Sequence, residues 1–242
     1  MWEHYRQHYV PEGLIVTAAG GVDHDEVCAL VTDALGRGGW DLTGDIAPLP
    51  RRDPSAPFEA GLREEVNVSR PDLEQTQIMM GVRGLRATDE RRSVLGVYSA
   101  ILGGGMSSRL FQEIREKRGL TYAVGSYGAP STEIGMYGLY AACAPAKAAE
   151  VERLMVAEFE RMAEGVTDAE LERAKGQIAG STVLRLEDSY SRMSRLGKAE
   201  LVFGELWSIS EVLDQVHAVT AEQVVALAEE LANRDRSFVR VG

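Results

Sequence analysis

The sequence predicts an α+β fold, in which a mostly antiparallel sheet packs against helices and a short β-α segment precedes it. Three observations support this prediction. Short apolar or alternating runs typical of strands occupy the middle of the chain, and helical runs opened by capping boxes fill its C-terminal part. A cluster of prolines separates both from the N-terminal segment. The expected order after this cluster, β-β-α-α-β-β-α-α-α, is typical of a layered α+β domain.

The composition is that of an ordinary globular protein. The chain has 242 residues, of which 45% are hydrophobic and 26% charged, enough for one or two domains. The net charge of -11 argues against nucleic-acid binding and is compatible with basic peptide partners. No apolar run approaches the ~20 residues of a membrane helix, and Met1 to Gln7 lack signal-peptide features, so we expect no membrane contact and a cytoplasmic location. Cys28 and Cys143 are interpreted as small core residues of a reducing compartment, with a disulfide between them as the alternative.

The N-terminal segment is predicted to be one strand and one helix. Residues 14–22 form a continuous apolar run, as expected for a strand covered on both faces. Asp23 is the expected N-cap of the helix and Glu26 its capping partner. The inward stripe of this helix would be Val27, Leu30, Val31 and Ala34. A unit of this size cannot hold a core alone, so we expect its strand to pair with a second copy or another chain.

The proline cluster sets the predicted domain boundaries. Four of the eight prolines lie between Pro48 and Pro57, next to charged residues, which is typical of a linker. The prediction is a β-α segment over residues 1–45, a linker over 46–60 and a second domain over 61–242.

The second domain is predicted element by element. Strand-like runs lie near 62–68 and 75–83, and a helix over 89–102 would bury Val94, Leu95, Tyr98, Ile101 and Leu102. A second helix begins near Ser107 and stops at Gly119, and the strands 122–129 and 136–144 follow. The later helices begin at three capping boxes, which are Thr167 with Glu170, Ser208 with Glu211, and Thr220 with Gln223. Residues 238–241 are a candidate final strand.

The glycine triplet Gly103 to Gly105 resembles a phosphate-binding loop only superficially. A phosphate loop follows a strand and commonly ends in Gly-Lys-Ser/Thr, whereas this triplet follows a predicted helix and leads into Met106 and Ser107. We therefore exclude nucleotide binding and predict a tight turn between helices, with Ser107 or Ser108 as N-cap.

Arg115 and Tyr122 lie seven residues apart on either side of the predicted helix stop at Gly119. This spacing puts a guanidinium on the last helical turn and a phenol at the start of the next strand, where the two can converge. The spacing alone also fits a simpler interpretation, a solvated ion pair of Arg115 with Glu113 or Glu116.

The segment Leu102-Gly103-Gly104-Gly105-Met106-Ser107-Ser108-Arg109-Leu110-Phe111-Gln112-Glu113-Ile114-Arg115-Glu116-Lys117-Arg118-Gly119-Leu120-Thr121-Tyr122 resembles the signature of the second, zinc-free half of pitrilysin/insulinase-type metallopeptidases, the family that includes the mitochondrial processing peptidases. The segment 188–197, Asp-Ser-Tyr-Ser-Arg-Met-Ser-Arg-Leu-Gly, is similar to another part of that family. Residues 1–45 then resemble the end of the first peptidase domain, and 61–242 the complete second, inactive domain.

The resemblance implies that Arg115 and Tyr122 reach into a substrate chamber and contact the peptide. It also implies that zinc belongs to the parent enzyme or to a partner half. This chain lacks the inverted His-x-x-Glu-His motif, so it carries no catalytic residues of its own and should be inactive alone. The predicted function is the non-catalytic half of a zinc-dependent metalloendopeptidase (a hydrolase). Its expected partners are a peptide substrate and a zinc-bearing half or subunit, and the chain is expected to form a homo- or hetero-oligomer. The alternative is a structural or assembly subunit that keeps the fold without proteolytic activity.

His4 and His8 form the one pattern that imitates a zinc site. Histidines at i and i+4 share a helix face, but Gln7 stands where the motif needs its glutamate, and a neutral amide cannot accept a proton from a zinc-bound water. We interpret the pair as coincidental and predict no metal site, with a stand-alone metal protein using His4 and His8 as the alternative.

Overall fold

The computed structural model describes residues 1–43, 46–49 and 64–242, which form two compact units. The larger unit holds the described part of Asp53–Ser181 together with Ile209–Gly242. The smaller unit holds the described part of Met1–Arg52 together with Thr182–Ser208. Most of the predicted linker 46–60 lies outside the described residues.

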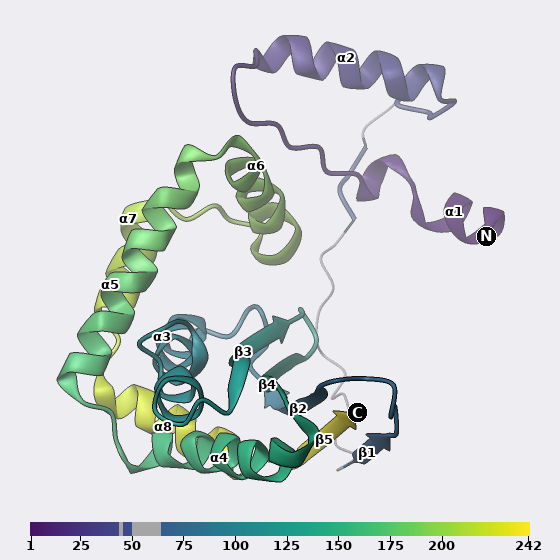
Figure 1. Cartoon of the computed structure of the whole chain (residues 1–242). Helices are drawn as coiled ribbons and strands as arrows, with labels where there is room; N and C mark the ends of the chain where they lie inside the picture. Colours follow the sequence, from purple (N-terminus) through teal and green to yellow (C-terminus); the bar gives the residue numbers. More distant parts are fainter. Residues whose placement is uncertain (44–45, 50–63) are drawn as a thin grey trace. The chain divides into compact units, whose positions relative to one another are not determined.

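The larger unit is built on one five-stranded sheet in the order β1-β5-β2-β4-β3 (Figure 1). β5 pairs in parallel with β1, and every other pairing is antiparallel. The strands are β1 (Glu65–Val68), β2 (Thr76–Gly84), β3 (Thr121–Pro130), β4 (Gly135–Cys143) and β5 (Arg236–Val241). The sheet is therefore mostly antiparallel, as the sequence predicts.

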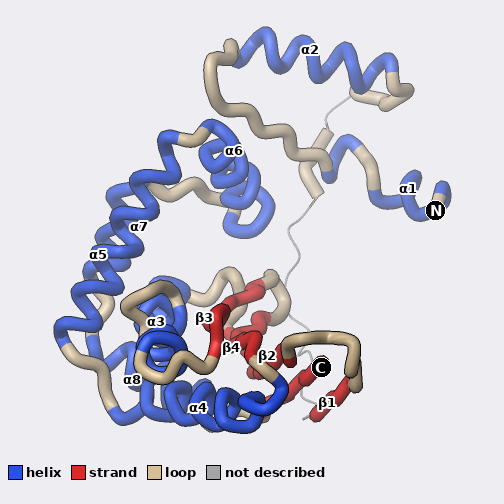
Figure 2. The backbone as a smooth tube through the Cα atoms, viewed as in Figure 1, coloured by secondary structure: helices blue, strands red, loops and turns tan. Residues whose placement is uncertain are grey.

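Helices cover one face of this sheet. α3 (Arg92–Gly103), α4 (Ala148–Arg161) and α8 (Ala221–Ala232) contact β3, β4 and β2 and lie together beside the strands (Figures 1 and 2). Alternate residues of β2, among them Ile78, Met80 and Val82, are buried beneath them. The long α5 (Asp168–Leu184) and the shorter α7 (Ile209–His217) complete the helical part. Helices on one face and a mostly antiparallel sheet confirm the predicted α+β class.

The sequence located these elements to within a few residues. The helix predicted over 89–102 is α3, and four of its five expected core side chains are buried, while Leu95 is only partly covered. The expected capping boxes at Thr167 and Thr220 form reciprocal bonds with Glu170 and Gln223. The candidate final strand 238–241 is β5 and lies between β1 and β2 in the sheet.

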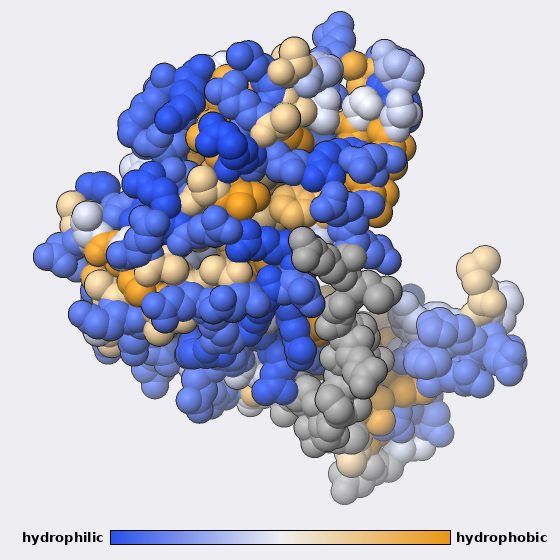
Figure 3. Space-filling view, turned by 90° about the horizontal axis from the view of Figure 1, so that it is seen from below, coloured by the Kyte–Doolittle hydropathy of each residue, from blue (hydrophilic) through white to orange (hydrophobic). Residues whose placement is uncertain are grey.

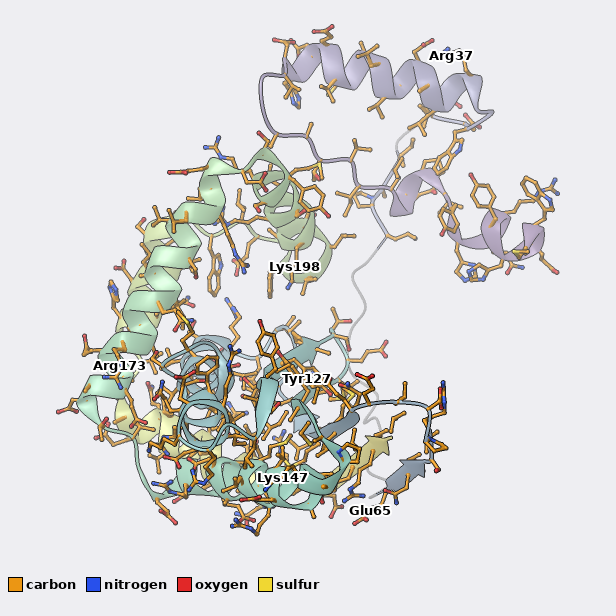
Figure 4. The ribbon with its side chains drawn as sticks, viewed as in Figure 1. Arg37, Glu65, Tyr127, Lys147, Arg173 and Lys198 are labelled. Atoms are coloured by element: carbon orange, nitrogen blue, oxygen red, sulfur yellow. The ribbon has the colours of Figure 1, made fainter. Side chains whose placement is uncertain are left out.

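No helix in the described part of the larger unit covers the second face of the sheet. Met79, Met136, Tyr140 and Val239 point to this face and are 37–43% exposed. Figure 4 shows Tyr127 on the strand side of this unit and Lys147 at the start of α4. Seen from below, where α4 lies, the molecule presents a mostly hydrophilic surface with scattered apolar patches (Figure 3). The open sheet face thus combines apolar side chains with solvent exposure.

The smaller unit contains α1 (Trp2–His8), α2 (His24–Arg37) and α6 (Ser189–Lys198). Asp23 caps α2 as predicted, accepting a bond from the backbone N–H of Glu26 (3.0 Å). Short helical turns complete the described chain: η1 (Pro11–Gly13), η2 (Phe111–Glu116), η3 (Pro145–Lys147), η4 (Met162–Glu164), η5 (Arg185–Glu187) and η6 (Ala199–Phe203).

Two predictions for the N-terminal segment are wrong for this structure. Residues 14–22 form no strand, since the described chain gives them no neighbouring strand with which to exchange hydrogen bonds. The expected inward stripe of α2 includes no buried residue, and Leu30 is 61% exposed. Cys28 on the same helix is exposed rather than part of a core, whereas Cys143 is buried as predicted, and both thiols are free.

Candidate functional site

The glycine triplet makes the turn between α3 and the helical segment that carries the candidate residues. A Cβ on Gly103 would lie 2.4 Å from the backbone nitrogen of Ser126 in β3, so only glycine allows this approach. Gln177 of α5 donates a hydrogen bond to the carbonyl of Gly104 (2.8 Å). The triplet is therefore a packing turn. Ser108, one of the two predicted N-cap residues, directly precedes the helical residues, and its carbonyl accepts the N–H of Gln112, while its hydroxyl donates to the carbonyl of Gly105 (2.6 Å).

Arg109 ties the next helical turn to α5. Its guanidinium makes a bidentate contact with the carboxylate of Glu170 (2.7 and 3.0 Å) and donates to the carbonyls of Arg161 and Gly165. Both side chains of the pair are less than a fifth exposed. Burial raises the pKa of Glu170, but the hydrogen bonds from Arg109 and Thr167 outweigh it, so that the pKa is about 2. This contact fixes the segment that leads to Arg115.

Arg115 lies in the last turn of η2, which is a π-helix over Phe111–Glu116. Single π-turns are rare and shift the side chains that follow relative to a regular helix. Gly119 ends the turn with φ of +61°, and the carbonyls of Arg115 and Ile114 accept the N–H groups of Gly119 and Leu120. The chain then enters β3 directly, as expected for a helix stopped by glycine.

The side chains of Arg115 and Tyr122 converge as their spacing predicts. The Nη1 of Arg115 donates to the backbone carbonyl of Tyr122 (2.7 Å). The guanidinium carbon lies 4.5 Å from the centre of the Tyr122 ring and 4.7 Å from that of Phe111. Both distances are within the range of cation–π attraction. Two rings and one carbonyl therefore hold the guanidinium in place.

The simpler ion-pair interpretation of Arg115 holds for Glu116 but not for Glu113. Glu113 instead accepts from Lys117 and from Arg118, and the hydrogen bonds of these two cations hold its pKa below the usual value. Glu116 forms a long ion pair with Arg115, at 4.0 Å. The guanidinium of Arg115 is thus held by two aromatic rings and a carbonyl, with one carboxylate at the limit of an ion pair.

Tyr122 presents its phenol to solvent. The side chain is 77% exposed and sits at an irregularity of β3, where the register with β4 shifts between Thr121 and Ala123. The extra residue of such a bulge is freed from the alternation of the strand, and bulges often redirect a functional side chain. A hydrogen-bond donor is therefore displayed beside a fixed guanidinium.

Phe111 is the member of this group that sequence reasoning missed. It lies four residues before Arg115, a spacing at which helical side chains are neighbours, and this was the available signal. Its role could not be read from the sequence, because an apolar residue at this position is equally expected in the core.

His4 and His8 lie on α1, with stacked rings whose centres are 4.2 Å apart. The Nδ1 of His8 is bonded to the backbone carbonyl of His4 (2.9 Å), so that nitrogen is already engaged. Within residues 1–43, 46–49 and 64–242, no three His, Cys, Asp or Glu side chains are grouped to hold a metal ion. Two imidazoles next to the neutral Gln7 do not fit a hydrolytic zinc site.

The fold and the signature segment define a class of protein, and comparison with known families agrees. Residues 1–178 match the family described as peptidase M16 inactive domain, and the chain belongs to this family. The resemblance to the zinc-free half of metallopeptidases is thereby confirmed.

Particular relatives carry the name zinc protease. The chain is 43% identical to an uncharacterized zinc protease of Streptomyces coelicolor, over 98% of this chain and 52% of that protein. It is 31% identical to the uncharacterized zinc protease YmxG of Bacillus subtilis, over 99% of this chain and 56% of the relative. The chain therefore spans about half the length of the relatives it matches.

Solved structures share the fold. A peptidase M16 inactive domain from Pseudomonas fluorescens superposes with a TM-score of 0.75 at 25% identity, covering 92% of this chain and 52% of the other. A chain of complex III2 from Candida albicans gives 0.74 at 19% identity, covering 92% and 53%, and indicates the fold alone. No helix in the described part of the chain is both long and apolar enough to span a membrane.

Proposed function

We propose that this chain is the non-catalytic half of a zinc-dependent metalloendopeptidase and that it contacts the substrate peptide through Arg115 and Tyr122. The observation that carries the proposal is the guanidinium of Arg115, held by two rings and a carbonyl beside an exposed phenol. Membership of the M16 inactive-domain family and the names of the half-matching relatives support the peptidase context.

The two groups suit the charge that develops when a peptide bond is hydrolysed. The attacked carbonyl oxygen becomes negative, and a phenol that donates to it stabilises the transition state more than the ground state. A guanidinium held in one place is suited to a neighbouring carbonyl, since it loses little freedom on binding. The other half would supply the zinc and the general base. This chain would contribute contacts to the peptide and electrostatic stabilisation of the transition state.

The exposed residues of the smaller unit fit an attachment surface for the zinc-bearing half. Residues 14–22 are mostly apolar and form no strand pairing within the described chain, and no residue of the apolar stripe of α2 is fully buried there. An unpaired extended segment offers backbone groups to an incoming strand. Hydrogen exchange over residues 14–37 should slow when the zinc-bearing half is added, and unchanged exchange in a complex that forms would refute this attachment.

Reconstitution tests the proposed function. The isolated chain should not cleave unstructured fluorogenic peptides even with added zinc, and mixing it with the zinc-bearing half should produce cleavage. Activity of the isolated chain that a chelator removes would overturn the proposal. A stable complex that never cleaves would point instead to the structural subunit.

Point variants separate the two roles in the reconstituted enzyme. Tyr122→Phe should lower kcat by about 10²-fold with little change in KM, because one donor to a developing oxyanion is removed. Arg115→Lys keeps the charge but loses the planar contact with the rings, so KM should rise. Tyr9→Phe removes a phenol from another exposed tyrosine and serves as the control. An unchanged kcat for Tyr122→Phe would remove the phenol from the mechanism.

A further inference from the structure

An open cavity of about 690 Å³ lies at one end of the sheet, where β2 ends and β4 and β5 begin. It is separate in sequence from the η2 segment that carries Arg115. The residues that line it come from three segments, 81–91, 134–136 and 233–237, all in the larger unit.

Glycines allow the backbone segments of the cavity wall to pack closely. A Cβ on Gly135 would fall 1.7 Å from the carbonyl oxygen of Leu85, and one on Gly84 would lie 2.8 Å from the carbonyl carbon of Met136. Backbone therefore meets backbone along this part of the wall, and a side chain at either position would collide with it. The apolar part of the lining comes from Val82, Leu85, Ile134 and Met136.

Four arginines line the cavity, and two of them are neutralised. Arg91 pairs with Asp89 (3.1 Å) and with Glu230 (2.5 Å). Arg234 also pairs with Glu230 and donates to the backbone carbonyls of Arg83 and Gly84. These bonds fix the backbone from which the Arg83 side chain projects.

The other two arginines retain their bonding capacity. Arg83 and Arg86 are exposed, and neither guanidinium has a hydrogen bond or close ion pair with another residue in the described ranges. Arg86 acts on Asp89 only as a more distant charge. Arg83 faces Met136 across the β2–β4 ladder, so a cation and an apolar side chain stand side by side at the rim.

The local charge favours a singly charged anion. The four arginines face three carboxylates, namely Asp89 and Asp235 in the lining and Glu230 behind it, which leaves an excess of one positive charge. This excess stands out in a chain whose net charge is -11. A carboxylate carries one charge and two acceptor oxygens that match a guanidinium.

We propose that this cavity binds a carboxylate of the substrate peptide, with the adjacent apolar side chain of that peptide against Ile134 and Met136. The idea rests on the proposed function, because it assumes that this half contacts the peptide. Both a peptide C-terminus and an acidic side chain offer the same group. Arg83 and Arg86 would bind it, and Arg234 would act as a positioning residue.

Binding to the whole 242-residue chain tests the proposal without the zinc-bearing half. Fluorescence anisotropy would compare three labelled short peptides: one ending in a leucine free acid, the same peptide as the C-terminal amide, and an amidated peptide with glutamate next to leucine. The free acid should bind the chain about tenfold to a hundredfold more tightly than the amide, the range expected for a hydrogen-bonded charge. If the amidated peptide with an internal glutamate binds as the free acid does, an acidic side chain can supply the carboxylate. If it does not, the carboxylate is that of the peptide C-terminus. Either result supports the site, provided that the free acid binds more tightly than the amide.

Variants complete the test. The double variant Arg83→Gln, Arg86→Gln should lose the preference for the free acid, and its thermal unfolding checks that it is folded. Arg173→Gln removes the same charge from an exposed position on α5 and should bind as the wild type does. Equal binding of acid and amide, or an unchanged double variant, overturns the site. Such a failure would leave the proposed function standing, since that depends on Arg115 and Tyr122 in the cleavage assay.

Discussion

The bidentate pair between Arg109 and Glu170 should make a measurable share of the stability of the larger unit. The Glu170 side chain is 17% exposed, and its pKa is lowered from 4.5 to about 2. At about 1.36 kcal/mol per pH unit, this difference corresponds to about 3 kcal/mol of stabilisation at neutral pH. Glu170→Gln keeps the size of the side chain but replaces one of its two acceptor oxygens with an NH2 donor, so the variant removes the charge and one arm of the bidentate contact.

We expect Glu170→Gln to lower the free energy of unfolding at pH 7 by about 2–4 kcal/mol, because it leaves the buried guanidinium of Arg109 without a counter-charge. The pH dependence has a definite sign. A carboxyl group whose pKa is depressed by folding stabilises above its unfolded pKa, and this contribution is lost as the pH falls from about 4.5 towards about 2. The gap between wild type and variant should therefore shrink by about 1.4 kcal/mol between pH 7 and pH 3.5.

Urea denaturation followed by circular dichroism at both pH values measures these quantities. Glu172→Gln is the matched control, since Glu172 lies on the same helix, is 73% exposed and pairs only at 3.4 Å with Lys175. Its effect should stay within about 0.5 kcal/mol. The reasoning fails if Glu170→Gln matches the control at pH 7, or if its deficit does not change on acidification.

Three further predictions concern packing and reactivity. Gly103→Ala should lower the free energy of unfolding by about 1–3 kcal/mol, because its Cβ would collide with the β3 backbone at 2.4 Å. Gly176→Ala, where a Cβ would meet no atom within 4 Å, should raise it by up to about 1 kcal/mol in the same thermal unfolding assay. A destabilised Gly176→Ala or a neutral Gly103→Ala would contradict this. Tyr98→Phe should leave the free energy of unfolding in urea titrations unchanged or raise it by up to about 1 kcal/mol, because the buried hydroxyl of Tyr98 has no hydrogen-bond partner in the described chain. A loss of more than about 1 kcal/mol would show that the hydroxyl does have a partner. A thiol reagent at pH 7 should label the exposed Cys28 quickly and Cys143 only after unfolding, because burial both shields Cys143 and raises the pKa of its thiol. Rapid labelling of both thiols in the native chain would contradict the packing of β4 in this structure.

The sequence alone was sufficient for elements whose signals are local. Alternation located β2, helical periodicity located α3, and the side chains of Thr167 and Thr220 marked helix starts, since each signal depends on neighbours within a few residues. The seven-residue spacing across Gly119 likewise predicted that Arg115 and Tyr122 meet. Resemblance then supplied the family, which the comparisons confirm.

Tertiary structure decided what depends on distant residues. Residues 14–22 have the composition of a strand but form none, because a strand needs a partner that the described chain does not supply. The rings of Phe111 and Tyr122 pack on Arg115, whereas Glu113 pairs with Lys117 and Arg118 and not with Arg115. The cavity beside Arg83 joins three segments up to about 150 residues apart, as the bond from Arg234 to Gly84 illustrates, and no local pattern encodes such a meeting. Local sequence thus determined the elements and one short-range pair, while long-range packing decided which side chains were left free to bind.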